Sequence, residues 1–191
     1  MLKYLHQPDV IAAALAAIFV VLGVNLPARA EDHSTYNGYW WSTLSVSERE
    51  RFLDGVSDCY IYDARGGHAL SPSIVAAQKI SEFYNRRTDQ KSTSVLIVFH
   101  GLEDKAEWAT TKHGYFDGDY WRQFGKAEKL AFVRGYLACR AAYLHAPTRR
   151  TPEFYESDIS HWFGTKDGYP DVNVKTASDK IGDVIDRLAE R

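Results

Sequence analysis

Two segments of this 191-residue chain repeat each other without a gap. Each matching residue of the second segment lies 80 positions after its counterpart, as Trp121 follows Trp41. Self-similarity of this length indicates an internal duplication, which sets both the structural unit and the expected symmetry of the fold. The matching residues are Trp41, Leu44, Glu48, Phe52, Leu53, Gly55 and Cys59 in the first segment and Trp121, Phe124, Glu128, Phe132, Val133, Gly135 and Cys139 in the second.

The first predicted helix of each copy carries the matching glycine and cysteine. In the first copy it begins near Ser45, because Ser45 and Glu48 fit a capping box, and in the second copy it covers residues 128–144. Helical spacing gathers apolar residues on one face of each helix. The predicted face comprises Phe52, Gly55, Cys59 and Tyr62 in the first copy and Phe132, Gly135, Cys139 and Ala142 in the second, with Arg49, Arg51, Asp54 and Asp58 placed largely off it.

Two further helices are expected in each copy. Ser71-Pro72 and Thr151-Pro152 each fit an N-cap followed by a proline in the first helical turn. The apolar run of residues 94–100 fits a buried strand or a helix equally well. Its counterpart at residues 178–191 has the periodicity of an amphipathic helix, and we therefore predict a helix over residues 92–102. The apolar stripe predicted for the first proline-started helix is Ile74, Ala77, Ile80, Phe83 and Tyr84.

The copies cover residues 36–102 and 116–188. A unit of about 70 residues with three short helices is too small to bury its apolar faces alone. The sequence therefore predicts an all-α fold in which two tandem three-helix repeats pack about a pseudo-two-fold axis. Residues 31–191 are expected to form one domain.

The matching glycines and cysteines predict how the copies meet. Glycine inside a helix costs about 1 kcal/mol relative to alanine, so Gly55 and Gly135 are expected where two helix backbones approach closely. If these helices cross near the axis, Cys59 and Cys139 lie one turn further along and can meet. We predict a Cys59–Cys139 disulfide, which requires Cα atoms within about 7 Å. The alternative is two buried free thiols.

The N-terminus is typical of an export signal. Residues 11–24 form an apolar run, and Ala28-Arg29-Ala30 fits an A-x-A cleavage site. We predict that residues 1–30 are a signal peptide and that the mature protein is periplasmic or secreted, where oxidising conditions favour a disulfide. The alternative is an uncleaved anchor, because residues 10–26 approach the length of a membrane span. No later stretch is long and apolar enough to span a membrane.

Charge and motifs argue against several classes of function. A formal net charge of −2 gives no basic footprint for nucleic-acid binding. No metal or cofactor is expected, because the seven histidines form no H-E-x-x-H motif. Asp117-Gly118-Asp119 resembles part of a calcium loop but lacks the twelve-residue pattern. Glu48 and Glu128 could be a pair of hydrolytic carboxylates, but both fit capping positions better. We predict no catalytic residues.

Aromatic residues precede both glycine–cysteine helices. Trp41 and Trp121 match each other and are expected to anchor the core. Other aromatic residues nearby lie in less periodic surroundings, and an exposed patch of them would suit a protein or sugar partner. The residues predicted to form this patch are Tyr39, Trp40, Tyr115, Phe116 and Tyr120.

The order of elements resembles the exported Tai-type immunity proteins of type VI secretion. The likeness rests on a Phe-x-x-Gly-(Tyr/Val)-x-x-Cys helix, a proline-started helix with an aromatic pair, and a short apolar helix. Residues 132–139 (FVRGYLAC) carry it best, and it covers each copy once. The resemblance implies a periplasmic protein that occludes a toxic cell-wall enzyme. This chain departs from the family in its tandem duplication and its single cysteine per copy, where the family bridges within a unit. No inhibitory residue can be carried over.

These observations together predict an exported helical binding protein with a protein partner in the cell envelope. An immunity-type inhibitor of an envelope effector is the specific form that the resemblance implies. The alternative is a small-ligand binder or enzyme with a cleft between the copies, lined by His100, His113, Asp117 and Tyr120. A deep pocket joining these four residues would favour the alternative. A purely structural envelope protein is a third possibility.

Overall fold

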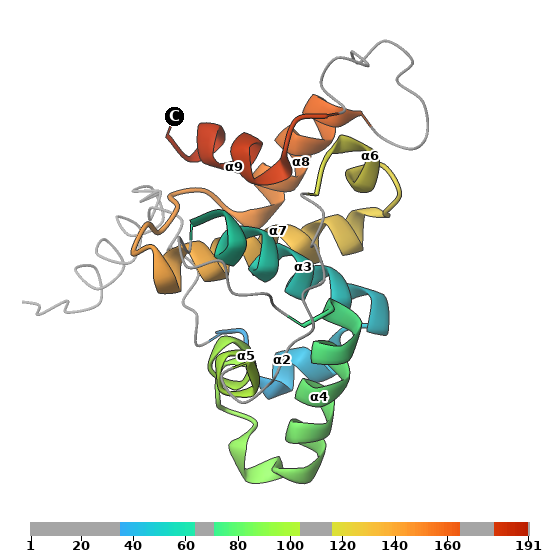
Figure 1. Cartoon of the computed structure of the whole chain (residues 1–191), viewed down its shortest axis with the longest axis vertical. Coiled ribbons are helices and arrows are strands. Elements are labelled where there is room, and N and C mark those ends of the chain that lie inside the picture. Colours follow the sequence, from blue (N-terminus) through green and yellow to red (C-terminus); the bar gives the residue numbers. More distant parts are fainter. Residues whose placement is uncertain (1–34, 64–70, 104–115, 165–177, 191) are drawn as a thin grey trace, which may run out of the picture.

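The computed structural model describes residues 35–63, 71–103, 116–164 and 178–190 (Figure 1). Every regular element in these ranges is helical, which confirms the prediction of an all-α fold. The predicted signal peptide, residues 1–30, lies outside the described residues, as do His113 and Tyr115. The elements are α2 (Gly38–Thr43), α3 (Val46–Asp63), α4 (Ser73–Arg86), the 3-10 helix η2 (Thr88–Gln90), α5 (Val95–Glu103), α6 (Gly118–Trp121), α7 (Lys126–Tyr143), α8 (Pro152–Phe163) and α9 (Ile181–Ala189).

The ambiguous apolar run is helical, as its second copy predicts, and forms α5. The start of α8 also agrees with the prediction, because the Thr151 side chain caps the helix and accepts from the N–H of Phe154. At the equivalent start of α4 the structure differs by one residue. Pro72 occupies the cap position and no side chain caps the helix there.

Two short helices, α2 and α6, add one element to each copy and were not predicted. Asn37 caps α2, and its side-chain oxygen accepts from the N–H groups of Tyr39 and Trp40 at 3.0 and 3.2 Å. Asp117 caps α6 in the same way, accepting at 3.1 Å from two N–H groups. Asn-Gly and Asp-Gly are typical turn signals, but a short polar side chain before glycine also satisfies the free donors of a helix.

Equivalent contacts tie the beginning of each copy to its last helix. The N–H of Val95 donates to the carbonyl of Tyr36 at 2.7 Å, and the N–H of Ile181 donates to the carbonyl of Phe116 at 3.0 Å. Each contact sits beside an isolated antiparallel bridge, Asn37 with Ser94 and Asp117 with Lys180. These contacts agree with a duplication, while the pseudo-two-fold arrangement of whole repeats stays a prediction.

Helices α3 and α7 lie side by side across the middle of the molecule, with α4 and α5 on one side and α8 and α9 on the other (Figure 1). A Cβ built on Gly55 would lie 2.0 Å from the carbonyl oxygen of Phe132. A Cβ built on Gly135 would lie 1.9 Å from the carbonyl oxygen of Phe52. Both glycines therefore permit the close backbone approach predicted for them. Gly55 packs against Phe132, one turn before Gly135, and Gly135 packs against Phe52, one turn before Gly55.

A disulfide joins Cys59 to Cys139, with Cα atoms 6.2 Å apart. It confirms the predicted bridge and connects α3 to α7 one turn beyond the two glycines.

Trp41 and Trp121 are each 1% exposed, so both anchor the core as predicted. None of the described helices combines the length and the apolar character needed to cross a membrane.

Candidate functional site

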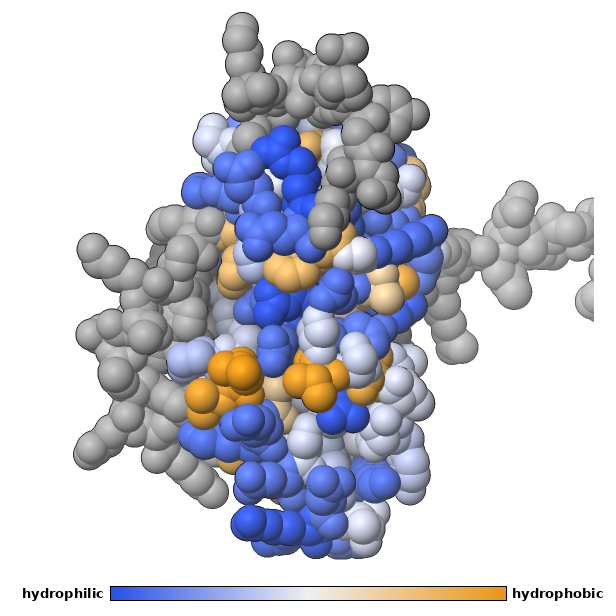
Figure 2. Space-filling model, turned by 90° about the vertical axis from the view of Figure 1, so that its right-hand side faces the viewer, coloured by the Kyte–Doolittle hydropathy of each residue, from blue (hydrophilic) through white to orange (hydrophobic). Residues whose placement is uncertain are grey.

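A groove of about 500 Å³ opens between the first turns of α3 and one face of α4. Val46 and Ile74 line it and are 67% and 52% exposed. Ile74 was predicted on the buried stripe of α4. Ala77, Ile80 and Tyr84 of that stripe are buried, whereas Ile74 is exposed. The face of the molecule seen in Figure 2 carries apolar patches separated by hydrophilic side chains.

The groove contains an arginine whose position is fixed by hydrogen bonds. Arg49 lies in α3 and donates from Nε to the carbonyl of Trp41 at 3.0 Å. Its Nη1 lies 3.5 Å from Oγ of Ser81, and its guanidinium carbon lies 5.7 Å from the centroid of the Trp41 ring. The Trp41 indole N–H donates to the same Ser81 oxygen at 3.0 Å. The guanidinium is therefore held beside a buried indole rather than moving freely in solvent.

Two carboxylates line the same groove, and each pairs with an arginine other than Arg49. Glu50 pairs with Arg51 at 3.1 Å, and Glu82 pairs with Arg86 at 3.4 Å. Within the described part of the chain, no carboxylate lies within 4.0 Å of Arg49. The groove thus combines exposed apolar side chains with a positive charge that has no carboxylate partner among the described residues.

The two matched glutamates are helix caps, as predicted. The carboxylate of Glu48 accepts from the N–H of Ser45 at 2.8 Å, and that of Glu128 accepts from the N–H of Gly125 at 3.0 Å. The hydrogen bonds from Ser45 lower the pKa of Glu48. Glu128 also accepts a hydrogen bond from the hydroxyl of Ser47, which connects the two copies. Among the described residues, no three His, Cys, Asp or Glu side chains are grouped in a way that could hold a metal ion.

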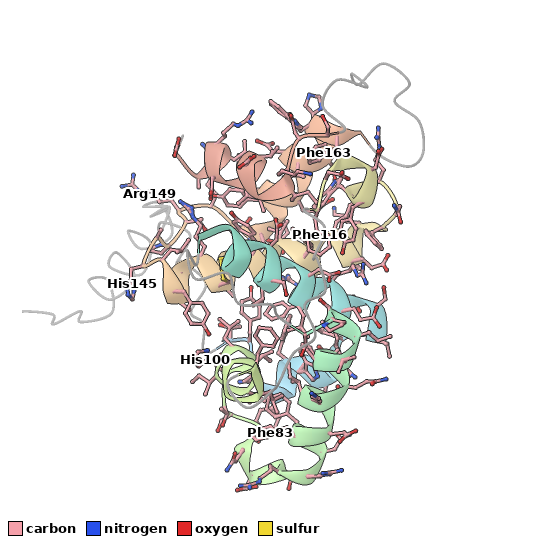
Figure 3. The ribbon with its side chains drawn as sticks, in the orientation of Figure 1. Phe83, His100, Phe116, His145, Arg149 and Phe163 are labelled. Atoms are coloured by element: carbon pink, nitrogen blue, oxygen red, sulfur yellow. A yellow bond between two sulfur atoms is a disulfide. The ribbon has the colours of Figure 1, made fainter. Side chains whose placement is uncertain are left out.

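Of the four residues proposed to line a cleft between the copies, Asp117 and Tyr120 are neighbours at α6, His100 is not near them, and His113 lies outside the described residues. Asp117 is the cap of α6, and the hydroxyl of Tyr120 is bonded to a carboxylate of α3. His100 is exposed on α5, with its ring 6.1 Å from that of Tyr143. Figure 3 shows His100 well separated from Phe116, the neighbour of Asp117 in sequence.

Three of the residues predicted to form an exposed aromatic patch, Trp40, Phe116 and Tyr120, are partly buried against the core. Trp40 packs against Phe52 with ring centroids 5.0 Å apart, and Phe116 packs against Phe132 at 5.6 Å. These rings extend the core at the start of α3 and α7, and both are partly buried. Of the other three predicted residues, Tyr39 is 62% exposed, Tyr120 is partly buried against the core, and Tyr115 lies outside the described residues.

Tyr120 belongs to a polar network that the sequence did not predict. Its hydroxyl accepts from Arg51 at 2.8 Å and donates to the carboxylate of Asp54. Asp54 also accepts from the hydroxyl of Ser73 at 2.5 Å and pairs with Arg51 at 3.0 Å. Burial raises the pKa of Tyr120, which keeps the phenol protonated as a donor. Asp54 was predicted off the buried face, but these donors allow it to be 7% exposed.

No protein-family model, curated protein or solved structure matches the chain. The resemblance to Tai-type immunity proteins therefore stays a prediction.

Asp58 is a second aspartate of α3 that was predicted off the buried face and is buried, with 7% of its surface exposed. It lies where α3 meets α7 and α9, because a Cβ built on Gly182 would lie 3.1 Å from both the Asp58 carboxylate and the Tyr136 ring. Burial is the main cause that raises the pKa of Asp58 to about 7. Nearby charges that add to this rise are Asp183 and Asp54, and the groups that oppose it are the N–H of Gly182 and the side chain of Lys180.

Replacing Asp58 with asparagine is expected to change how stability depends on pH. The unfolded chain loses the Asp58 proton near pH 3.8, whereas the folded protein keeps it until about pH 7. Across this window the group lowers the free energy of unfolding by about 1.4 kcal/mol per pH unit as pH rises. Asp58→Asn should remove that slope and be more stable than the wild type at pH 8. Urea denaturation across this range tests it, with exposed Asp89→Asn as a control that should keep the slope.

Proposed function

We propose that this chain is an exported binding protein whose groove between α3 and α4 receives a protein partner in the cell envelope. The observation that supports this most is the exposure of Val46 and Ile74 around a fixed arginine. Exposed apolar side chains bordered by polar groups are typical of protein interaction sites. The buried disulfide is compatible with export, because such bonds persist in oxidising compartments. An inhibitor of an envelope effector is the specific form that the resemblance to Tai-type immunity proteins adds.

The groove is supported by rigid neighbours, which favours binding without a large ordering cost. Helix α3 is joined to α7 by the disulfide and by the close glycine contacts. The first turn of α4 is held to α3 by the hydrogen bond from Ser73 to Asp54. The two walls of the groove are therefore fixed relative to each other before a partner arrives.

A photo-cross-linking residue at position 74 tests this proposal in intact cells. We expect p-benzoylphenylalanine at Ile74 to give a discrete adduct with one envelope protein. Position 97 provides the matched control, because Ile97 is an isoleucine that is 66% exposed on α5, outside the groove. The same residue at position 97 should give no such adduct. Equal labelling at both positions, or none at position 74, would contradict the proposal.

A further inference from the structure

One of the positions at which the two copies differ lines the groove. Trp41 donates its indole N–H to Ser81 at 3.0 Å, and Trp121 donates its indole N–H to Ser160 at 3.2 Å. The serines identify equivalent positions on α4 and α8, which are 79 residues apart. Four residues before each serine, the first copy has Ala77 and the second has a glutamate.

In the second copy this glutamate supplies a buried negative charge. Glu156 is 5% exposed, and its carboxylate accepts from the hydroxyl of Ser160 at 2.8 Å. Lys129 is also 5% exposed, and its ammonium lies 5.5 Å from the centroid of the Trp121 ring. A buried carboxylate and a buried cation therefore border the same tryptophan–serine pair. Opposite charges in one buried region reduce the cost of removing each from water.

The first copy keeps the cation of this arrangement and lacks the carboxylate. Arg49 is the counterpart of Lys129, 80 positions earlier, and lies beside Trp41 in the same way. Ala77 stands in place of the glutamate, so Ser81 donates instead to the carbonyl of Ala77 at 2.7 Å. The groove between α3 and α4 lies at this position, lined by both Arg49 and Ala77.

We infer that the groove binds an acidic side chain of the protein partner, which takes the place that Glu156 fills in the second copy. The carboxylate accepts from the guanidinium of Arg49, whose Nε is already bonded to Trp41 and whose Nη2 has no partner in the described part of the chain. Apolar atoms next to that carboxylate contact Val46 and Ile74. This inference rests on the proposed function and specifies the chemistry of the partner: an aspartate or glutamate beside an apolar residue.

A small carboxylate tests the site without the partner. In ¹⁵N-labelled full-length protein, we expect 3-methylbutanoate to shift the indole N–H signal of Trp41 in a saturable manner. The indole signal of Trp121 provides an internal control, because its site already contains Glu156. The uncharged 3-methylbutan-1-ol should not produce the shift. An equal response to the alcohol, or no saturable shift of the Trp41 signal, would overturn the inference.

Two variants test the charge itself. Ala77→Glu copies the second repeat and should fill the groove from within, while Arg49→Gln removes the cation. Each should weaken 3-methylbutanoate binding by about tenfold or more, the usual effect of losing a charged hydrogen bond. Gln123→Glu adds the same charge as Ala77→Glu at an exposed position and should bind like the wild type. The Trp121 indole signal reports whether each variant is folded.

The cross-linking experiment separates this inference from the proposed function. If the adduct at Ile74 forms and is unchanged in Ala77→Glu and Arg49→Gln, the inference fails while the proposed function stands. If 3-methylbutanoate binds as expected but Ile74 gives no adduct, the carboxylate site stands and the proposed protein partner fails. Loss of the adduct in both variants, but not in Gln123→Glu, supports both the protein partner and the carboxylate site.

Discussion

Replacing Gly135 with alanine is expected to lower the free energy of unfolding by at least about 3 kcal/mol, at the upper end of overpacking effects. The added Cβ would lie 1.9 Å from the carbonyl oxygen of Phe52. That oxygen belongs to the backbone of α3, so no flexible side chain can move aside. The two helices must separate, and contacts along their whole crossing weaken together. Gly55→Ala has the same consequence, because its Cβ would lie 2.0 Å from the carbonyl oxygen of Phe132.

Gly101 provides a matched control for this experiment. It also lies in a helix, but a Cβ built there has no neighbour within 4 Å. Gly101→Ala should therefore leave stability unchanged or raise it by up to about 1 kcal/mol, since alanine favours helix. Urea denaturation of the three single variants measures the difference. A Gly135→Ala variant as stable as Gly101→Ala would show that the helices do not cross at these glycines.

The double variant Gly55→Ala/Gly135→Ala adds a further check on the geometry. Both clashes act on the same pair of helices, so the separation caused by one substitution relieves part of the other. The combined loss of stability should be smaller than the sum of the two single losses. Full additivity would indicate that the glycines act at independent sites.

The duplication predicted those parts of the fold that both copies share. Gly55 and Cys59 could be interpreted because each has a counterpart at the same place in the second copy, and two unusual helix residues in register indicate a shared contact. The same comparison identified α5 as a helix. The apolar run in its own sequence shows no clear helical period, whereas the equivalent helix α9 is clearly amphipathic. The short helices α2 and α6, capped by Asn37 and Asp117, were not predicted, because helices of this length are too short to show an apolar period.

The buried Asp58 and the candidate groove, which sequence reasoning also missed, depend on residues without an equivalent in the other copy. Asp58 corresponds to Ala138, and its burial depends on Gly182, more than a hundred residues away in sequence. Helical periodicity alone places such an aspartate on a polar face, since a charge is seldom buried without partners. The candidate groove was missed for the same reason, because it also depends on a residue that differs between the copies. It depends on Ala77 differing from Glu156, and this pair is recognisable once the Trp–Ser hydrogen bonds show that α4 and α8 align with a shift of one residue.

The Cys59–Cys139 disulfide is expected to contribute about 4 kcal/mol to the free energy of unfolding, through the entropy of the loop that it closes. The two cysteines are 80 residues apart in sequence, so the bond greatly restricts the unfolded chain. Comparing oxidised with reduced wild-type protein in urea isolates this effect, because both forms keep the same buried sulfur atoms. Cys59→Ala/Cys139→Ala should be less stable than the reduced protein, since it also loses core volume. Equal stability of the oxidised and reduced forms would contradict this prediction.

The rate of reduction connects the disulfide to the glycine crossing. Cys59 and Cys139 are 1% and 0% exposed, so a thiol reagent reaches the bond only when α3 and α7 move apart. Under native conditions, dithiothreitol should therefore reduce the folded wild type far more slowly than the urea-unfolded protein. Gly135→Ala weakens the helix contact next to the bond and should be reduced faster than Gly101→Ala. Equal rates for these two alanine variants would mean that the bond is reached by a route that does not separate the helices.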